Sequence, residues 1–297
     1  MTIIDAHSHL WLKQDTVVDG SPIYSLEKNP SRSMFFGEER QMLPPFMIDG
    51  RNTAEVFLSN MDYAQVSAAV VVQEVIDGNQ NDYLTDVQAQ YPGRFFCMGM
   101  VEEGLPSEAE RLFARGFRGI AIPGHRLHTP LTQWIPMFQR MEQLGMVLDL
   151  CLHEDNHQLA EVEEVVKACP DLKIAIGHFG MVTCEGWMEQ IRLARHKNVY
   201  VESGGITWLF NAEFYPYPSA MQAIRQAADE VGIEKLMWGS DYPRTITAIT
   251  YRMSYDFVLK SDVLTDREKQ LFLGENARQF YGFKELVELP YIKNMSE

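Results

Sequence analysis

Eight short apolar runs, each followed by an amphipathic segment, are the feature of this sequence that most restricts its fold. The runs begin at Ile3, Ser67, Arg94, Phe117, Met146, Leu172, Asn198 and Lys235. They are apolar almost throughout, which is typical of strands buried on both faces of a parallel sheet. The segments between them carry two capping-box patterns and a glycine stop, which are helix signals. These signals are Ser107-x-x-Glu110, Thr265-x-x-Glu268 and Gly145.

This alternation of strand and helix predicts an α/β protein, and more specifically a single closed (β/α)₈ barrel, the TIM barrel. An open doubly wound sheet with a nucleotide site usually has a glycine-rich turn after its first strand. Here that turn carries the motif His7-x-His9 instead. We expect residues 1–297 to form one domain, and residues 13–49 to form a long loop after the first strand. A loop of this length is a candidate cover for an active site.

The composition restricts the partners that the chain could have. With 46% hydrophobic and 23% charged residues it is typical of a globular protein. A net charge of −15 would repel nucleic acid and an anionic membrane surface, so we expect neither as a partner. The four cysteines form no close pair, and no apolar run approaches a membrane span. We therefore expect a cytoplasmic protein with a small-molecule substrate, and a homodimer is one expected assembly.

Histidines gather where the predicted strands end, and in a barrel the carboxyl ends of the strands form the catalytic face. His7 and His9 end the first strand and project in the same direction, because side chains alternate along a strand. His153 ends the fifth strand, His178 the sixth, and Asp241 the eighth. One such histidine would be interpreted as an ordinary core or loop residue. The whole set predicts a site for Zn²⁺, Mn²⁺ or Fe²⁺, which accept nitrogen and oxygen ligands.

Four motifs in this order, "DAHSH", "LCLHE", "AIGHFG" and "WGSDYP", resemble the amidohydrolase superfamily. The resemblance is to its amidohydrolase-related (amidohydrolase 2) group of TIM-barrel hydrolases, lactonases and decarboxylases, and it spans almost the whole chain. It implies one divalent ion, Zn²⁺ ahead of Mn²⁺ or Fe²⁺, with four protein ligands, His7, His9, His153 and Asp241. It also implies that His178 is catalytic. The fourth strand lacks the lysine of the two-metal members, so we expect a mononuclear site.

The implied ligand set predicts a hydrolase of a small-molecule ester, lactone or amide. Three imidazoles and a carboxylate leave a position on the ion open for water or substrate. The ion would lower the pKa of that water toward roughly 7 and polarise a carbonyl group. Asp241 would accept the water proton, and His178 would hydrogen-bond the substrate carbonyl or the attacking water.

The same residues are compatible with a second reaction, the non-oxidative decarboxylation of a small aromatic or unsaturated acid. In that reaction Asp241 would deliver a proton to carbon, within a flat aromatic slot that holds a cation for the acid. The predicted substrate-binding residues are Arg244, Trp11, Arg51 and Tyr242, with Arg126, Trp208 and Phe210 as further candidates.

Other interpretations stay open at the level of the sequence. A barrel that has lost catalysis and only binds a ligand is a third possibility, which the retention of all the expected site residues disfavours. Glu202 and Ser203 end the seventh strand, where they either contact substrate or brace the barrel rim. His125 and His128 are expected to line the mouth of the barrel or to bond loop carbonyls.

Overall fold

The computed structural model describes residues 1–295 and confirms an α/β barrel with all eight predicted strands. Residues 296 and 297, the end of the predicted single domain of residues 1–297, lie outside the described residues. The barrel strands are β1 (Ile4–Ser8), β6 (Ala68–Val71), β7 (Phe95–Cys97), β8 (Gly119–Ile122), β9 (Val147–Leu150), β10 (Lys173–Ile176), β11 (Val199–Glu202) and β12 (Leu236–Met237).

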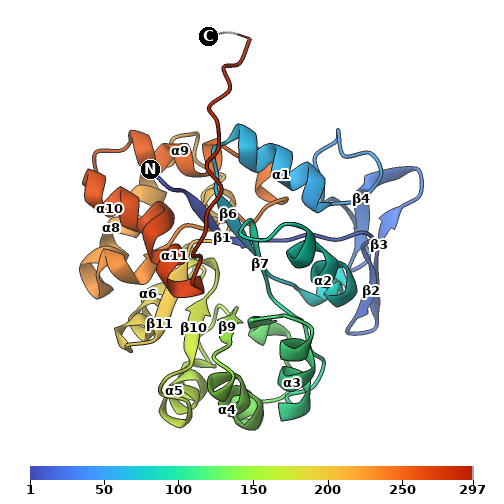
Figure 1. Ribbon diagram of the computed structural model, residues 1–297, viewed down its shortest axis with the longest axis vertical. Helices are drawn as coiled ribbons and strands as arrows, with labels where there is room; N and C mark the ends of the chain where they lie inside the picture. The colour runs from blue at the N-terminus through green and yellow to red at the C-terminus, as the bar shows by residue number, and fades with distance from the viewer. Residues whose placement is uncertain (296–297) are drawn as a thin grey trace.

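These strands form two parallel segments, β1-β6-β7 and β12-β11-β10-β9-β8. Parallel bridges between Ser8 and Tyr242 and between Gly99 and Ile120 join the two segments at both edges. Small side chains such as Ala6 and Ala68 and larger ones such as Met98 together form the apolar cluster of the barrel interior, while the larger apolar cluster lies between the strands and the helices. The helices surround the strands in Figure 1.

The helices lie between successive barrel strands and after the last one. They are α1 (Ala54–Tyr63), α2 (Asn81–Gln90), α3 (Pro106–Ala114), α4 (Ile135–Gln143), α5 (Leu159–Ala168), α6 (Trp187–Arg192), α7 (Ile206–Leu209), α8 (Pro218–Val231), α9 (Met253–Lys260), α10 (Asp266–Gln270) and α11 (Asn276–Tyr281). The capping box of Thr265 and Glu268 is confirmed. The one predicted at Ser107 is wrong, because α3 already begins at Pro106, whose fixed φ suits a first helical position.

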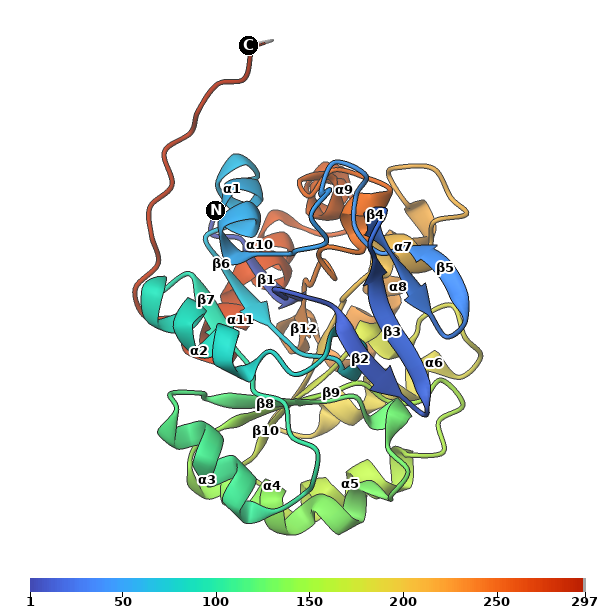
Figure 2. The ribbon, with the colours of Figure 1, turned by 90° about the vertical axis from the view of Figure 1, so that its right-hand side faces the viewer.

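The long connection after β1 is a folded sheet rather than the irregular loop that we predicted. It contains β2 (Asp15–Val18), β3 (Ser21–Leu26), β4 (Asn29–Phe35) and β5 (Glu38–Gln41), which pair in antiparallel order. Asp19 and Gly20 both have positive φ in the two-residue turn between β2 and β3, and Asp-Gly is a strong hairpin signal. Figure 2 shows this insertion sheet beside the barrel.

A buried carboxylate ties the first strand to the segment that follows the last one. Asp5 accepts hydrogen bonds from the Ser240 backbone N–H (2.8 Å), the Ser240 hydroxyl (2.5 Å) and the Tyr251 hydroxyl (2.7 Å). Burial raises the pKa of Asp5 to about 6, while these hydrogen bonds lower it. The residue after Ser240 is Asp241, so these hydrogen bonds fix the backbone position from which the Asp241 side chain extends.

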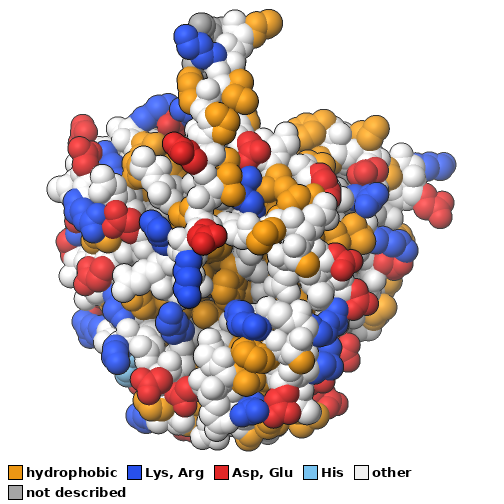
Figure 3. Space-filling model, viewed as in Figure 1, with side chains coloured by type: hydrophobic (Ala, Val, Ile, Leu, Met, Phe, Trp, Pro, Cys, Tyr) orange, Lys and Arg blue, Asp and Glu red, His pale blue; other side chains and the backbone are white. Residues whose placement is uncertain are grey.

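The exposed surface mixes both signs of charge. On the face in Figure 3, acidic and basic side chains are interspersed. The segment after α11 first runs along the barrel, where the Pro290 carbonyl accepts a hydrogen bond from Gln65 (3.3 Å). Its last described residues extend away in Figure 1 and carry exposed apolar side chains, among them Ile292 and Met295. None of the helices within residues 1–295 has both the length and the apolar character needed to cross a membrane.

Replacing Phe57 with Ala should destabilise the protein strongly. Phe57 on α1 is fully buried and stacks on Tyr242, with ring centroids 4.0 Å apart. Removing a buried Phe side chain typically costs about 3–5 kcal/mol, and we expect urea denaturation to show a loss of this size. Val56→Ala on the exposed side of the same helix is the control, and it should change the free energy of unfolding by less than about 0.5 kcal/mol. Equal stability of both variants would contradict the packing of α1 against the barrel.

Candidate metal centre

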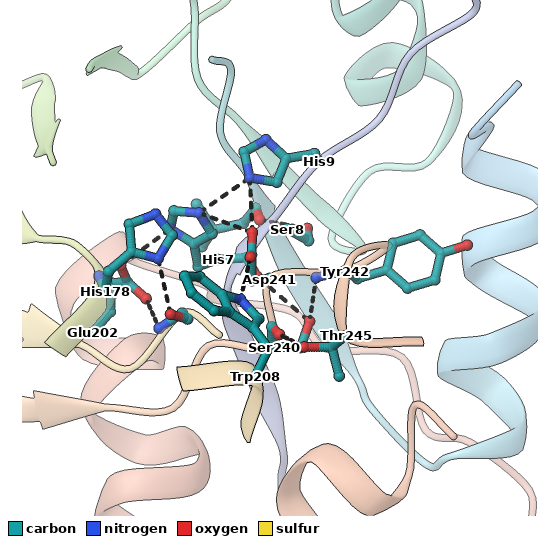
Figure 4. A network of polar contacts seen from close by, with 12 residues as sticks. His7, Ser8, His9, His178, Glu202, Trp208, Ser240, Asp241, Tyr242 and Thr245 are labelled. Carbon is teal, nitrogen blue, oxygen red and sulfur yellow. Dashed lines mark hydrogen bonds and ion pairs between the residues drawn. The ribbon is translucent and has the colours of Figure 1, made fainter. Parts of the chain in front are cut away.

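Closure of the barrel brings the two ends of the chain together at its catalytic face. The Asp241 N–H donates to the His7 carbonyl (2.9 Å), and the His9 N–H donates to the Tyr242 carbonyl (2.7 Å). These bonds place the Asp241 carboxylate beside both imidazoles, as Figure 4 shows. Asp241 has φ +59°, a strained backbone for a residue with a side chain and a feature that concentrates at functional sites.

The side chains of His7, His9 and Asp241, here called the central cluster, present three metal-binding atoms to one another. The Nε2 atoms of His7 and His9 are 3.2 Å apart. Asp241 Oδ1 lies 3.1 Å from His9 Nε2 and 3.7 Å from His7 Nε2. Ligand atoms about 2.0–2.2 Å from a tetrahedral zinc ion are roughly 3.3–3.6 Å apart. The identity and the spacing of these atoms therefore fit a divalent ion.

Each histidine of the central cluster has a second buried carboxylate beside its other ring nitrogen. His7 Nδ1 lies 3.1 Å from Glu202 Oε1, and His9 Nδ1 lies 3.1 Å from Asp77 Oδ2. Metal-binding histidines almost always present their second ring nitrogen to such a partner, which fixes the tautomer and the orientation of the ring. Glu202 was expected either to contact substrate or to brace the barrel rim. Its contact with His7 favours the bracing role. Asp77, in the short helix Val75–Asp77 after β6, was missed because no strand-end motif marks it.

The carboxylates in and beside the central cluster stabilise the charged forms of its two histidines. Burial lowers the pKa of His7, but the Glu202 carboxylate more than offsets this and raises it to about 9. Burial likewise opposes the charged form of His9, whose pKa is nonetheless raised by hydrogen bonds with Asp241 and Asp77. Burial raises the pKa of Asp241, but the His9 hydrogen bond and the neighbouring imidazoles hold it well below its usual range. A metal ion must displace the imidazole protons, so its affinity should rise with pH.

His178 lies beside the central cluster, as predicted. It begins the short helix His178–Gly180 after β10, and its ring centroid is 4.7 Å from that of His7. Burial lowers the pKa of His178, which favours the neutral imidazole. Its Nδ1 lies 2.9 Å from the Gly204 carbonyl oxygen. Because that oxygen can only accept, Nδ1 carries the proton and Nε2 is left as an acceptor.

These groups open into a cavity of about 480 Å³. Trp11 and Arg244 line it, as predicted, and so do Arg126 and Trp208. The Trp208 indole N–H donates to Asp241 Oδ2 (2.6 Å), and the Arg244 guanidinium lies 3.7 Å from the centre of the Trp208 ring. The insertion sheet supplies part of the wall through residues near β4 and β5, Phe35, Arg40, Gln41 and Met42. A role of residues 13–49 as a cover stays a prediction.

Two predicted substrate-binding residues lie elsewhere. The Tyr242 ring is fully buried against Phe57 and points away from the central cluster in Figure 4. Arg51 is exposed just before α1 and is not among the described residues that line the cavity. Both assignments are therefore corrected.

His153 lines the cavity but lies apart from the central cluster. Its side chain is 40% exposed, and its Nδ1 is 3.0 Å from Asp155 Oδ1. His125 also lines the cavity, and burial lowers its pKa to about 4. His128 is exposed, with Nε2 2.7 Å from Asp19 on the insertion sheet.

Sequence reasoning also missed Asp149, a charged residue in the middle of β9. It is buried, lines the cavity, and lies close to His7 and Glu202. Its Oδ2 has no hydrogen-bond donor among the described residues. Burial raises the pKa of this carboxyl well above its ordinary value. The signal that could have found it is the aspartate inside the apolar run "MVLDLCL".

A (β/α)₈ barrel with two histidines and an aspartate converging at the carboxyl ends of its strands defines a class of barrel proteins built to hold a metal ion. The family model described as Amidohydrolase matches residues 4–283. The chain belongs to the amidohydrolase family. It is 22% identical to 4-sulfomuconolactone hydrolase of Rhizobium radiobacter over 267 residues, which cover 82% of this chain and 86% of the relative.

Solved structures share the fold. A probable 2-pyrone-4,6-dicarboxylic acid hydrolase of Acinetobacter baumannii superimposes with a TM-score of 0.70 at 22% identity, covering 95% of this chain and 100% of that one. A zinc-bound amidohydrolase of Burkholderia multivorans has a TM-score of 0.72 at 17% identity, covering 95% and 99%. A 5-carboxyvanillate decarboxylase of Novosphingobium aromaticivorans, complexed with manganese, has a TM-score of 0.59 at 18% identity, covering 80% and 83%.

Replacing Asp77 with Asn should weaken zinc binding, because the neutral amide no longer offers a charged partner to His9 Nδ1. Loss of such an outer carboxylate typically costs about 10–100-fold in metal affinity. Competition with a chromogenic chelator would measure the change. Asp82→Asn is the control, since that side chain is 99% exposed on α2. Unchanged zinc affinity in Asp77→Asn would remove Asp77 from the support of the site.

Proposed function

We propose that this chain is a metal-dependent hydrolase of a small-molecule ester, lactone or amide, and that a lactone bearing an anionic group fits best. The observation that carries the proposal is the convergence of His7 Nε2, His9 Nε2 and Asp241 Oδ1 beside one cavity. Two proteins that it resembles are named as hydrolases of 4-sulfomuconolactone and of 2-pyrone-4,6-dicarboxylic acid. Both names describe a cyclic ester with acidic substituents.

The central cluster would hold one divalent ion, with Zn²⁺ first and Mn²⁺ or Fe²⁺ as alternatives. When bound, such an ion supplies Lewis acidity and lowers the pKa of water. Asp241 is positioned to accept a proton from the attacking water and pass it to the leaving group, while the Trp208 indole holds its Oδ2. His178 Nε2 is an acceptor, so among its two predicted roles it orients that water rather than donating to the substrate carbonyl.

The cavity suits a small anionic substrate. Its volume of about 480 Å³ lies in the range of small-molecule sites. Arg126 is neutralised by Glu74 at 2.8 Å. Arg244 stacks on Trp208 and forms no ion pair with another residue among 1–295, which leaves its donors for a ligand carboxylate or sulfonate. The local cation outweighs the distant negative charge of the protein, because exposed charges are screened beyond about 10 Å.

A second candidate is the non-oxidative decarboxylation of a small aromatic or unsaturated acid. The stacked pair of Arg244 and Trp208 also fits a flat ring that carries a carboxylate. One protein of similar fold is named as a decarboxylase. A cytoplasmic location and a homodimer stay predictions.

The deciding experiment begins with elemental analysis of protein purified without chelator. The protein is then stripped of metal and assayed against panels of lactones and aromatic acids, with and without added Zn²⁺ or Mn²⁺. Hydrolysis that needs the added ion and incorporates ¹⁸O from labelled water supports the proposal. Release of carbon dioxide without incorporated oxygen would replace it with the decarboxylase. Equal activity with and without metal would overturn both.

Asp241→Asn should lower kcat by about 10²–10⁴-fold, the usual contribution of general acid and base catalysis, with further loss if the ion binds more weakly. Circular dichroism should show an unchanged fold, because Ser240 and Tyr251 still hold Asp5. Near-normal turnover would remove Asp241 from the mechanism.

Arg244→Ala should raise KM roughly 10–100-fold for an anionic substrate, the value of one charge-assisted hydrogen bond. The value for a neutral ester should change little. Tyr242→Phe is the control, because the ring lies in the core and its hydroxyl is buried away from the cavity. A loss that is equal for neutral and anionic substrates would show that Arg244 does not bind the anionic group.

A further inference from the structure

Glu202, the last residue of β11, contacts groups on two sides of the candidate metal centre. Its side chain is fully buried, and its Oε1 lies 3.1 Å from His7 Nδ1. The same oxygen accepts a hydrogen bond from the His178 backbone N–H (2.8 Å), and Oε2 accepts one from the Gly204 N–H (2.5 Å). Figure 4 shows the carboxylate beside the imidazoles of both histidines. One buried side chain therefore meets a candidate metal ligand and the residue expected to orient the attacking water.

Gly204 extends the influence of Glu202 to the ring of His178. The Gly204 N–H is bound by Glu202, and the Gly204 carbonyl oxygen lies 2.9 Å from His178 Nδ1. That oxygen can only accept, so its position keeps the proton on Nδ1 and leaves Nε2 as an acceptor. The carboxylate of Glu202 therefore restrains the His7 ring directly and the His178 ring through Gly204.

The backbone that carries His178 is strained and needs such a restraint. His178 has φ +54° and Phe179 has φ +51°, a left-handed conformation that is unfavourable for residues with a side chain. It persists only where the surrounding structure holds it, and such residues are concentrated at functional sites. The hydrogen bond from the His178 N–H to an ionised carboxylate is roughly twice as strong as one between neutral groups. Loss of the Glu202 charge should therefore let this turn relax.

Two glycines make room for the Glu202 carboxylate. A Cβ atom at Gly239 would lie 2.6 Å from Glu202 Oε2, and one at Gly204 would lie 2.8 Å from the same oxygen. Both distances are too short for a side chain, so only glycine lets the backbone approach the carboxylate this closely. The close approach fixes the position of Glu202 as well as its hydrogen bonds.

We propose that Glu202 is a positioning residue that sets the tautomer of His178 and couples His178 to the metal-ligand candidate His7. The catalytic consequence rests on the proposed function, in which His178 Nε2 orients the attacking water. Glu202→Gln removes the charge at constant size, and its amide cannot accept from both the His178 and the Gly204 N–H groups. Asp77→Asn is the matched comparison, because Asp77 stands beside His9 and no hydrogen bond joins it to His178 within residues 1–295.

¹⁵N NMR of the histidine side chains in the metal-free full chain tests the positioning role without turnover. The His178 signals are those missing from the spectrum of His178→Gln. The wild type and Asp77→Asn should show the proton on Nδ1 of His178, whereas Glu202→Gln should also populate the form protonated at Nε2. An unchanged Nδ1 tautomer in Glu202→Gln, with circular dichroism verifying the fold, would overturn the proposal. If Glu202→Gln does not fold, Gly204→Ala replaces it, because the added Cβ displaces the carboxylate and should shift the tautomer in the same direction.

A double-mutant cycle on kcat/KM, at saturating Zn²⁺ and with the panel substrate of highest turnover, tests the coupling. The effects of Glu202→Gln and His178→Gln should depart from additivity by about fivefold or more, because both changes act on the same imidazole. Those of Asp77→Asn and His178→Gln should combine within about twofold. Additive effects of Glu202→Gln and His178→Gln would refute the coupling. A chain without hydrolase activity would refute the proposed function alone, because the tautomer measurement needs no substrate.

Discussion

The structure depends on the junction between the first barrel strand and the segment after the last one. Asp5 accepts three hydrogen bonds from Ser240 and Tyr251, and the Asp241 N–H bonds the His7 carbonyl. The same contacts that close the barrel therefore place Asp241 against His7 and His9, although more than 230 residues separate them in the chain. Fold and site are stabilised together, so neither can shift without the other.

Three carboxylates surround the two imidazoles at this junction and stabilise their positive charge. Asp241 faces the Nε2 atoms of both imidazoles, while Glu202 faces Nδ1 of His7 and Asp77 faces Nδ1 of His9. Each ring is fixed by a charge on both sides, which offsets the cost of burying ionisable groups. Glu202 ends β11, Asp241 follows β12 and Asp77 ends a short helix after β6, so the barrel strands set the spacing of these groups.

Much of the fold followed from local patterns. All eight barrel strands were predicted because runs buried on both faces are apolar throughout, and the capping box at Thr265 was predicted from local spacing. The insertion sheet was not predicted, because most residues of its strands are polar or exposed, as in a loop. Its Asp19-Gly20 turn was the available signal. Tyr242 and Arg51 were misassigned because nearness in sequence to a site residue does not fix the direction of a side chain.

The sequence by itself determined which chemical groups are present and at which strand ends they lie, because period and residue type are local properties. Only the tertiary structure decided which of those groups meet. It joined His7 and His9 with Asp241, and it placed Glu202 beside His7 and Asp77 beside His9. It also turned His153 toward Asp155. The physical reason is that distances between strand ends depend on the closure, register and loop anchoring of the whole barrel, which no short segment encodes.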